Sequence, residues 1–374
     1  MPLKSIDASL LSIPFNAAFK HASAERSMTQ ALWVEATLQS GVVGFGEGCP
    51  REYVSAETVA TALGFVAAFR DEWLAQIRDV DSLSDWVRLH GTAIDQNPAA
   101  WTAVELAMLD AFGRERGWSI ESLLGLEPLS GQFRYTAVLG DGSIDRFRDQ
   151  LSRYLQLGFR QFKIKLSGVL ERDLGKVRAL SESGLAGDVV RADANNLWAD
   201  IDVAAAHLEA LDYRFFALEE PLRPHDHAGL RQLAQRLDTR IILDEGCLRA
   251  DQLDDLPRPS TIWIVNLRVS KMGGLLRSLD LLRSIRERGL GLIIGAHVGE
   301  TSILTRAALT IAACANDILL AQEGAFGTHL LENDVAQPPL MFGLGGVLGV
   351  DTFGFGGLPG LGLDISSRTP SAFE

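Results

Sequence analysis

The second part of the chain alternates short apolar runs with longer stretches of helical apolar spacing, beginning near Phe133. Short apolar runs are typical of buried strands, and a helix between successive runs is typical of parallel strands. The pattern predicts eight strands, near residues 133–139, 161–166, 188–193, 214–219, 240–244, 261–268, 291–297 and 318–323. These repeated units predict an α/β fold, a (β/α)7-8 barrel of the TIM type.

The first part of the chain has a different order of elements. Its hydrophobic pattern predicts strands first and helices afterwards, without alternation, which is typical of an α+β domain. The predicted strands are 3–13, 31–39 and 42–48, and the predicted helices are approximately 55–76, 82–91 and 98–116.

The last part of the chain is rich in glycine, and Pro338 and Pro339 mark where it begins. We expect it to be irregular and to return to the N-terminal domain. The predicted organisation is an α+β capping domain (1–128), a barrel domain (129–335) and a C-terminal segment that packs on the cap (336–374).

Three acidic residues, Asp193, Glu219 and Asp244, stand at the ends of consecutive predicted strands. About 25 residues separate each from the next, the length of one strand and its return helix. Because the carboxyl ends of barrel strands meet at one rim, we expect the three carboxylates to converge. Such a set of hard oxygen ligands suits a divalent cation such as Mg²⁺, whereas any one acid alone would be explained as a helix cap. The neighbouring polar residues, expected to support the ligands, are Asn195, Glu220 and Glu245.

Two lysines, Lys163 and Lys165, fall on one face of the second barrel strand because strand side chains alternate. A solvated edge strand is the alternative explanation, but Phe162, Ile164 and Leu166 on the other face read as buried. We expect one lysine to act as a general base, with a pKa lowered by its neighbour and the metal. The other would hold negative charge on the substrate.

The same spacing continues through Arg268, His297 and Glu323 at the ends of the last three strands. Arginine stays protonated, so Arg268 can stabilise charge but hardly remove a proton. His297 is either an acid–base group or a packing residue, and Glu323 either orients a substrate or caps a helix. Lys271 lies just past the sixth strand and could reach inward, although the glycines after it read as a loop.

The composition and charge of the chain argue against several classes of binding partner and cofactor. The formal charge of −13 argues against nucleic acid or an anionic membrane as a partner. Three widely spaced cysteines form no C-x-x-C pair, and no apolar run is long enough to span a bilayer, so we expect a cytoplasmic protein. The glycine-rich segments lack the spacing of dinucleotide or phosphate loops, which leaves nucleotide cofactors unsupported.

With these motifs in order, the chain resembles the mandelate racemase and muconate lactonizing branch of the enolase superfamily. The resemblance covers nearly the whole chain: Gly44-Phe-Gly-Glu-Gly48 and the helix 103–113, then K-x-K, D-x-N, E-E-P, D-E and K-x-G-G in the barrel. It implies Mg²⁺, with Mn²⁺ as a substitute, held by Asp193, Glu219 and Asp244. It also implies a chelated substrate carboxylate, an enolate formed by loss of the adjacent proton, and a homo-oligomer. Lys165 would be the base, with Lys163 beside it.

Within this family, the residues on the face of the substrate opposite Lys165 determine which reaction takes place. Muconate-lactonizing and dipeptide-epimerase relatives have a sixth-strand lysine where this chain has Arg268. Mandelate racemase relatives pair a sixth-strand aspartate with a histidine, matched here by His297, and have an eighth-strand glutamate like Glu323. An aspartate as the third ligand, here Asp244, is similar to the muconate-lactonizing branch, whereas a glutamate would favour the racemase branch. The eighth strand has Ala321 and Glu323 where dipeptide epimerases have D-x-D. This difference argues against a dipeptide as the substrate.

The resemblance implies an isomerase, either a racemase or epimerase or a cycloisomerase, acting on a small carboxylate or amino-acid derivative. His297 or Lys271 would be the acid opposite Lys165. An acid-sugar or hydroxy-acid dehydratase is one alternative, and a catalytically impaired metal-binding relative is another. Two capping loops resemble those that close over the site in this family, and their candidate substrate contacts are Lys20, His21, Arg51 and Tyr53.

Overall fold

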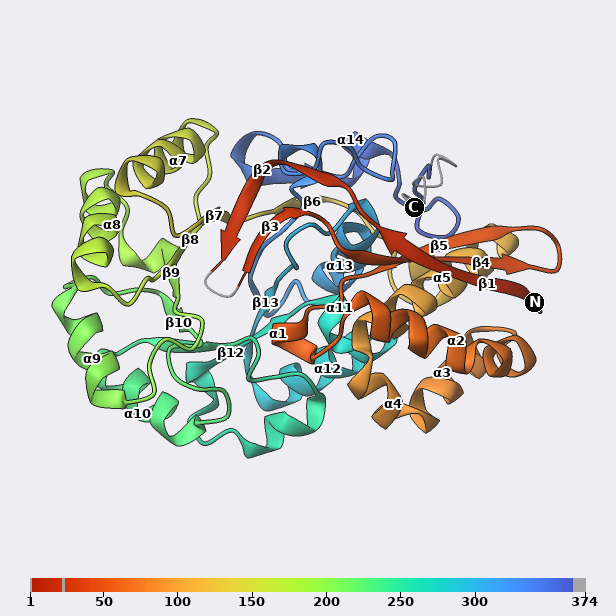
Figure 1. The fold of residues 1–374 in the computed structure, drawn as a ribbon, viewed down its shortest axis with the longest axis horizontal. Helices are drawn as coiled ribbons and strands as arrows, with labels where there is room; N and C mark the ends of the chain where they lie inside the picture. Colours follow the sequence, from red (N-terminus) through yellow and green to blue (C-terminus); the bar gives the residue numbers. More distant parts are fainter. Residues whose placement is uncertain (1, 22–23, 366–374) are drawn as a thin grey trace.

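The computed structural model describes residues 2–21 and 24–365, and for residues 17–21, 24 and 25 it describes the backbone alone. Eight parallel strands form a single curled sheet in chain order, which confirms the predicted α/β barrel-like fold (Figure 1). The amide of Thr136, before the first strand, donates to the carbonyl of Gln322 at 2.8 Å and links the two ends of the sheet. The strands are β7 (Ala137–Leu139), β8 (Phe162–Lys165), β9 (Val190–Asp193), β10 (Ala217–Glu219), β11 (Arg240–Leu243), β12 (Trp263–Leu267), β13 (Gly291–Ile294) and β14 (Leu319–Gln322).

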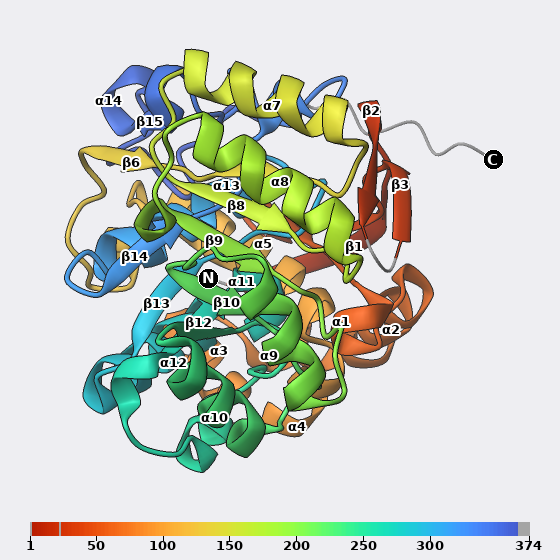
Figure 2. The same ribbon diagram turned by 90° about the vertical axis from the view of Figure 1, so that its left-hand side faces the viewer.

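Helices cover the outside of the curled sheet, and Figure 2 shows α7, α8, α9 and α10 along one side. In α7 the apolar residues Phe147 and Leu151 lie four positions apart, so both face the sheet and are buried. A 3₁₀ stretch (Ala250–Asp255) takes the place of a long helix between β11 and β12. The helices are α7 (Ile144–Gln156), α8 (Leu170–Glu182), α9 (Ile201–Ala210), α10 (His227–Leu237), α11 (Val269–Met272), α12 (Leu275–Arg288) and α13 (Ser302–Cys314).

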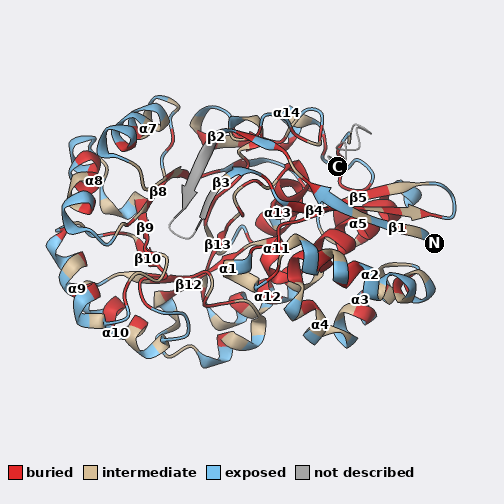
Figure 3. Ribbon diagram, in the orientation of Figure 1, coloured by how far each residue is buried: buried red, intermediate tan, exposed pale blue. Residues whose placement is uncertain are grey.

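The barrel strands are buried along most of their length, as Figure 3 shows. A small apolar cluster includes Ala217, Ile242, Ile264, Ile293 and Ala321. Charged side chains are also buried on these strands, among them Lys163, Arg191 and Glu219. Because an unpaired buried charge is costly, these residues must satisfy one another or a ligand.

The main elements of the capping domain are an antiparallel sheet and the helices that pack on it. The strands are β1 (Leu3–Leu11), β4 (Ala31–Leu38) and β5 (Val43–Gly48), and the helices are α2 (Val59–Gln76), α3 (Val80–Leu89), α4 (Gly91–Gln96) and α5 (Pro98–Arg116). A side chain at Gly46 would place its Cβ 1.9 Å from the carbonyl oxygen of Ala103 in α5, and Gly44 and Gly48 face similar contacts. These glycines therefore let a helix pack closely on a strand.

A hairpin between residues 14 and 28 was missed by the sequence prediction. It consists of β2 (Pro14–His21) and β3 (Ala24–Met28), which pair antiparallel. Pro14, Asn16 and Lys20 interrupt its apolar pattern, so no alternation marks it as a strand. Figure 1 shows the hairpin and the short helix α1 (Glu52–Ser55) projecting from the capping domain toward the barrel.

The C-terminal segment contacts both domains. The predicted strand 133–139 divides into β6 (Gln132–Arg134) and β7, and β6 pairs with β15 (Val347–Gly349). Further on, the amide of Leu361 donates to Asp110 in α5 at 2.7 Å. The remaining short helices are α6 (Ile120–Leu123) and α14 (Val350–Phe353). Among the described residues, no helix combines the length and the apolar character needed to cross a bilayer.

Candidate active site

Three buried acids stand at the carboxyl ends of β9, β10 and β11. Asp193 and Glu219 are direct neighbours in the sheet, and Asp244 follows the last residue of β11. Each is about 1% exposed. Burial, together with the charge of Asp193, raises the pKa of Glu219 to about 8. The three carboxylates therefore stand at the ends of neighbouring strands, and their mutual repulsion requires positive charge nearby.

Lys163 supplies part of that positive charge from the adjacent strand β8. Its ammonium group donates to Glu219 at 2.8 Å and to Glu323 at 3.1 Å, and lies 3.1 Å from Asp193. Burial disfavours the charged form of Lys163, but these three acids outweigh burial and raise its pKa. Lys163 is therefore a fixed cation beneath the acid cluster.

Lys165 lies two residues further along β8, on the same face. Its ammonium group donates to Asp193 Oδ2 at 2.5 Å and to Asn195 Oδ1 at 2.9 Å. Its side chain keeps 12% of its surface exposed, whereas that of Lys163 keeps 3%. Of the two lysines, Lys165 is thus the one within reach of a small molecule at the mouth of the barrel.

Arg268 and Lys271 both bind Asp244. A guanidinium nitrogen of Arg268 donates to Asp244 Oδ2, and the neighbouring acids raise the pKa of Arg268 despite its burial. Lys271 donates to Oδ1 of Asp244 at 2.9 Å and to the main-chain oxygens of Asp244 and Asn266 at 2.6 and 2.8 Å. Since an ammonium group has three donors, these contacts saturate Lys271. The geometry favours Lys271 as a support for Asp244 over its predicted role as a proton donor.

His297 follows the end of β13, and its side chain is 2% exposed. Among the described residues, neither ring nitrogen has a hydrogen-bond partner, although Nδ1 lies 3.5 Å from Glu300 Oε1. Burial lowers its pKa well below the usual value, and the charges of Arg268 and Arg51 lower it further. The imidazole is therefore neutral near pH 7 and can accept a proton.

Glu323 lies one residue past β14 and is held by two cations. Arg191 on β9 donates to it at 2.7 Å, and Lys163 donates at 3.1 Å. Sequence reasoning proposed Glu323 as a substrate contact and overlooked Arg191. Arg191 lies two residues before Asp193, so strand alternation places both on one face, and this signal could have found it. The geometry favours Glu323 as a support for Lys163.

The remaining predicted residues differ in their contacts with the acid cluster. Glu220 accepts the amides of Asp244 and Gly246 at 2.7 and 2.6 Å and so fixes the loop after β11. Burial raises the pKa of Glu245 to about 7. Tyr53 lies on the short helix α1. Arg51 is 1% exposed. The side chains of Lys20 and His21 lie outside the described residues.

The donor set fits a divalent cation in its chemistry. Three neighbouring carboxylates at one rim are the hard oxygen ligands that Mg²⁺ prefers. In the present arrangement their charges are balanced by Lys163, Lys165 and Arg268. Within the described part of the chain, no three acidic, histidine or cysteine side chains are at present arranged as a group that could hold a metal ion. A cation would thus bind by drawing the acids away from their present partners.

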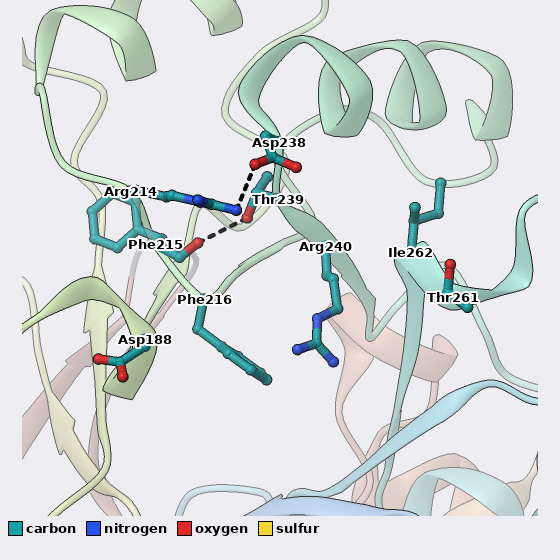
Figure 4. Close-up of a pocket in the computed structure, with 9 residues that line it drawn as sticks. All are labelled: Asp188, Arg214, Phe215, Phe216, Asp238, Thr239, Arg240, Thr261 and Ile262. Atoms are coloured by element: carbon teal, nitrogen blue, oxygen red, sulfur yellow. Dashed lines mark hydrogen bonds and ion pairs between the residues drawn. The ribbon is translucent and has the colours of Figure 1, made fainter.

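A cavity of about 670 Å³ lies at the opposite ends of the strands (Figure 4). Phe216 comes just before β10 and Arg240 begins β11, and the Arg240 guanidinium lies 4.2 Å from the centre of the Phe216 ring. Barrel enzymes carry their chemistry at the carboxyl ends of the strands. The acid cluster is therefore the candidate active site, and this cavity is a separate feature of the barrel.

Two family models match the chain. The Enolase C-terminal domain-like model matches residues 146–369, and the Mandelate racemase / muconate lactonizing enzyme N-terminal domain matches residues 6–125. The chain belongs to the mandelate racemase and muconate lactonizing enzyme family of the enolase superfamily. This membership confirms the predicted resemblance.

Relatives in this family are epimerases and racemases. A hydrophobic dipeptide epimerase of Enterococcus faecalis is 26% identical over 87% of this chain and 92% of the relative. The L-Ala-D/L-Glu epimerase of Bacillus subtilis is 24% identical over 97% of both chains. The crystal structure of a dipeptide epimerase from Enterococcus faecalis V583, complexed with Mg and the dipeptide L-Leu-L-Tyr, matches with a TM-score of 0.81 and 25% identity. That match covers 97% of this chain and 100% of the other.

Proposed function

We propose that the protein is a Mg²⁺-dependent racemase or epimerase acting at the carbon next to the carboxylate of a small amino-acid derivative. The observation that carries the proposal is the position of Lys165 and His297, two side chains capable of acid–base chemistry, at different strand ends of the barrel. Lys165 ends β8 and His297 follows β13, so four strands separate them on one side and two on the other. They therefore flank the acid cluster from nearly opposite sides of the rim.

In such a reaction the residues of this chain would have separate roles. Asp193, Glu219 and Asp244 would hold the metal, which supplies positive charge to the substrate carboxylate and to the enolate when bound. Lys163 adds fixed positive charge beside Glu219. The proton on one face of the substrate is exchanged by Lys165 Nζ, and the proton on the other face by a ring nitrogen of His297.

The relatives that are epimerases support epimerisation over dehydration. The lowered pKa of His297 makes the imidazole neutral, so it can accept a substrate proton on its side of the site, and the Lys165 ammonium group, which donates to Asp193, lies on the other side.

Solvent deuterium exchange tests this proposal. A panel of dipeptides and N-acyl amino acids is incubated with the enzyme and Mg²⁺ in D₂O and followed by proton NMR. We expect the α-proton signal to disappear while the epimer appears with deuterium at the same carbon, and chelation of the metal should stop both changes. An epimer that keeps its original proton, or formation of a keto acid from acid sugars in place of exchange, would contradict the proposal.

A further inference from the structure

His297 and Glu300 stand at the two ends of a tight turn that follows β13. The amide of Glu300 donates to the carbonyl of His297 at 3.2 Å, and the amide of His297 donates to Glu300 Oε1 at 2.7 Å. Gly299, between them, has a φ of 91°, and a Cβ at this position would lie 2.9 Å from the Phe15 ring. The turn is therefore closed by two hydrogen bonds, which bring the Glu300 carboxyl back onto His297.

Two further contacts hold this turn against the capping domain. Arg51 donates to the carbonyl of Val298 at 2.8 Å, and the hydroxyl of Thr301 donates to Glu47 on β5 at 2.6 Å. The Glu300 side chain is 7% exposed and that of His297 is 2% exposed. Because the turn is anchored on both sides and buried, the carboxyl has little freedom to move away from the imidazole ring.

The ring of His297 approaches the same oxygen that its main-chain amide binds. Its Nδ1 atom lies 3.5 Å from Glu300 Oε1. Burial raises the pKa of Glu300 to about 8, so at neutral pH its carboxyl carries a proton, and the bond from the amide places that proton on the other oxygen. Oε1 is thus an acceptor, and a favourable contact with it requires hydrogen on Nδ1. Nε2 then keeps the lone pair that a base needs.

The charges around His297 make this contact important for a proton-transfer step. Arg268, Arg51 and Lys271 each oppose a positive charge on the ring. Among the described residues, Glu300 is the one acid in close contact with the ring nitrogens. A hydrogen bond from Nδ1 to Oε1, which shortens when substrate binds, would offset part of this repulsion when Nε2 takes a proton.

We infer that Glu300 is a positioning residue for His297, whose Oε1 atom holds a hydrogen on Nδ1 and so keeps Nε2 unprotonated toward the substrate. The inference rests on the proposed function and adds a residue to the same site. In the step that it supports, the C–H bond next to the carboxylate breaks, its electron pair stays on the substrate as the enolate, and the proton forms a bond to Nε2. A role in closing the turn alone explains the bond to the main-chain amide, but not the approach of the ring nitrogen to the same oxygen.

The tautomer of His297 in the free protein tests this inference without a substrate. Long-range ¹H–¹⁵N correlation spectra are recorded at neutral pH for the wild type and Glu300→Met, and His297→Gln assigns the signals. We expect hydrogen on Nδ1 in the wild type, although free histidine favours the Nε2–H form, and a shift toward Nε2–H in Glu300→Met. Glu47→Gln removes a buried carboxyl from the same loop and should leave the tautomer unchanged. An Nε2–H form in the wild type, or the same tautomer in Glu300→Met, overturns the inference while the proposed function stands.

Exchange at each face of the substrate separates positioning from damage to the loop. The two epimers of an exchanging panel member are followed separately in D₂O with Mg²⁺, since one presents its proton to Lys165 and the other to His297. In Glu300→Met we expect kcat on the His297 face to fall by about a hundredfold with a small change in KM, and exchange on the Lys165 face to change little. Glu300→Gln keeps the acceptor oxygen and should retain most of the exchange. Equal losses on both faces overturn the inference. Absence of exchange in the wild type contradicts the proposed function instead, and the tautomer then decides the role of Glu300.

Discussion

The ammonium group of Lys176 donates to the main-chain carbonyl of Lys165 at 2.7 Å. Lys176 is buried on α8 and also binds Asp141 and Asp173 at 2.9 and 3.0 Å. Asp173 in turn accepts the amide of Ser167, just past β8. These contacts fix the backbone at the end of β8, and with it the direction of the Lys165 side chain.

Replacement of Lys176 by Met should therefore slow proton transfer more than it weakens substrate binding. We expect kcat for deuterium exchange to fall by about ten- to a hundredfold with a small change in KM, because a small misplacement of a catalytic group is costly. Arg172→Met is the matched control, since Arg172 binds the same Asp141 from an exposed position. Equal losses in the two variants would argue against a positioning role for Lys176.

Removal of the Arg268 charge should strengthen metal binding. Arg268 binds Asp244 and lies 4.0 Å from Glu219, so its fixed charge competes with a divalent cation for the same carboxylates. In Arg268→Met we expect the Kd for Mg²⁺ to decrease by about tenfold or more in calorimetric titration. Weaker Mg²⁺ binding in the variant would instead make Arg268 a necessary support for the ligands.

Glu47 should make the protein less stable as pH rises. It is fully buried in β5, accepts the amide and hydroxyl of Thr301, and burial raises its pKa from 4.5 to about 7. Its protonated form is favoured in the folded state, so its contribution is complete below pH 4.5 and declines until about pH 7. The shift corresponds to about 3 kcal/mol at most.

Urea denaturation of the wild type and Glu47→Gln at pH 5 and pH 8 measures this effect. We expect the free energy of unfolding of the variant to improve relative to the wild type at the higher pH. Other buried acids are common to both proteins and cancel in the difference. The same difference at both pH values would show that Glu47 does not titrate as described.

The spacing of the strands made the main features of the site predictable. Asp193, Glu219 and Asp244 follow apolar runs at a constant interval, and the alternation of Lys163 and Lys165 places both on one face. Each of these signals is local in sequence and depends only on the geometry of strands. The barrel and the acid cluster follow directly from them.

Other parts of the site depend on contacts that no local pattern encodes. Lys271 is saturated by main-chain oxygens, and such acceptors leave no trace in the sequence. Lys176 lies on a helix outside the barrel, where its spacing reads as surface charge. The hairpin of β2 and β3 has a polar sequence without strand alternation, so its position beside the barrel could be found only in three dimensions.

The most direct test of two-sided proton transfer follows exchange for each stereoisomer separately. The panel member that exchanges fastest is prepared as its two epimers, and both are incubated in D₂O with wild type, Lys165→Met and His297→Gln, with Mg²⁺ present. We predict that the wild type interconverts the epimers, and that each variant loses interconversion by at least about a thousandfold while remaining folded by circular dichroism. Interconversion at the wild-type rate in either variant would contradict the account.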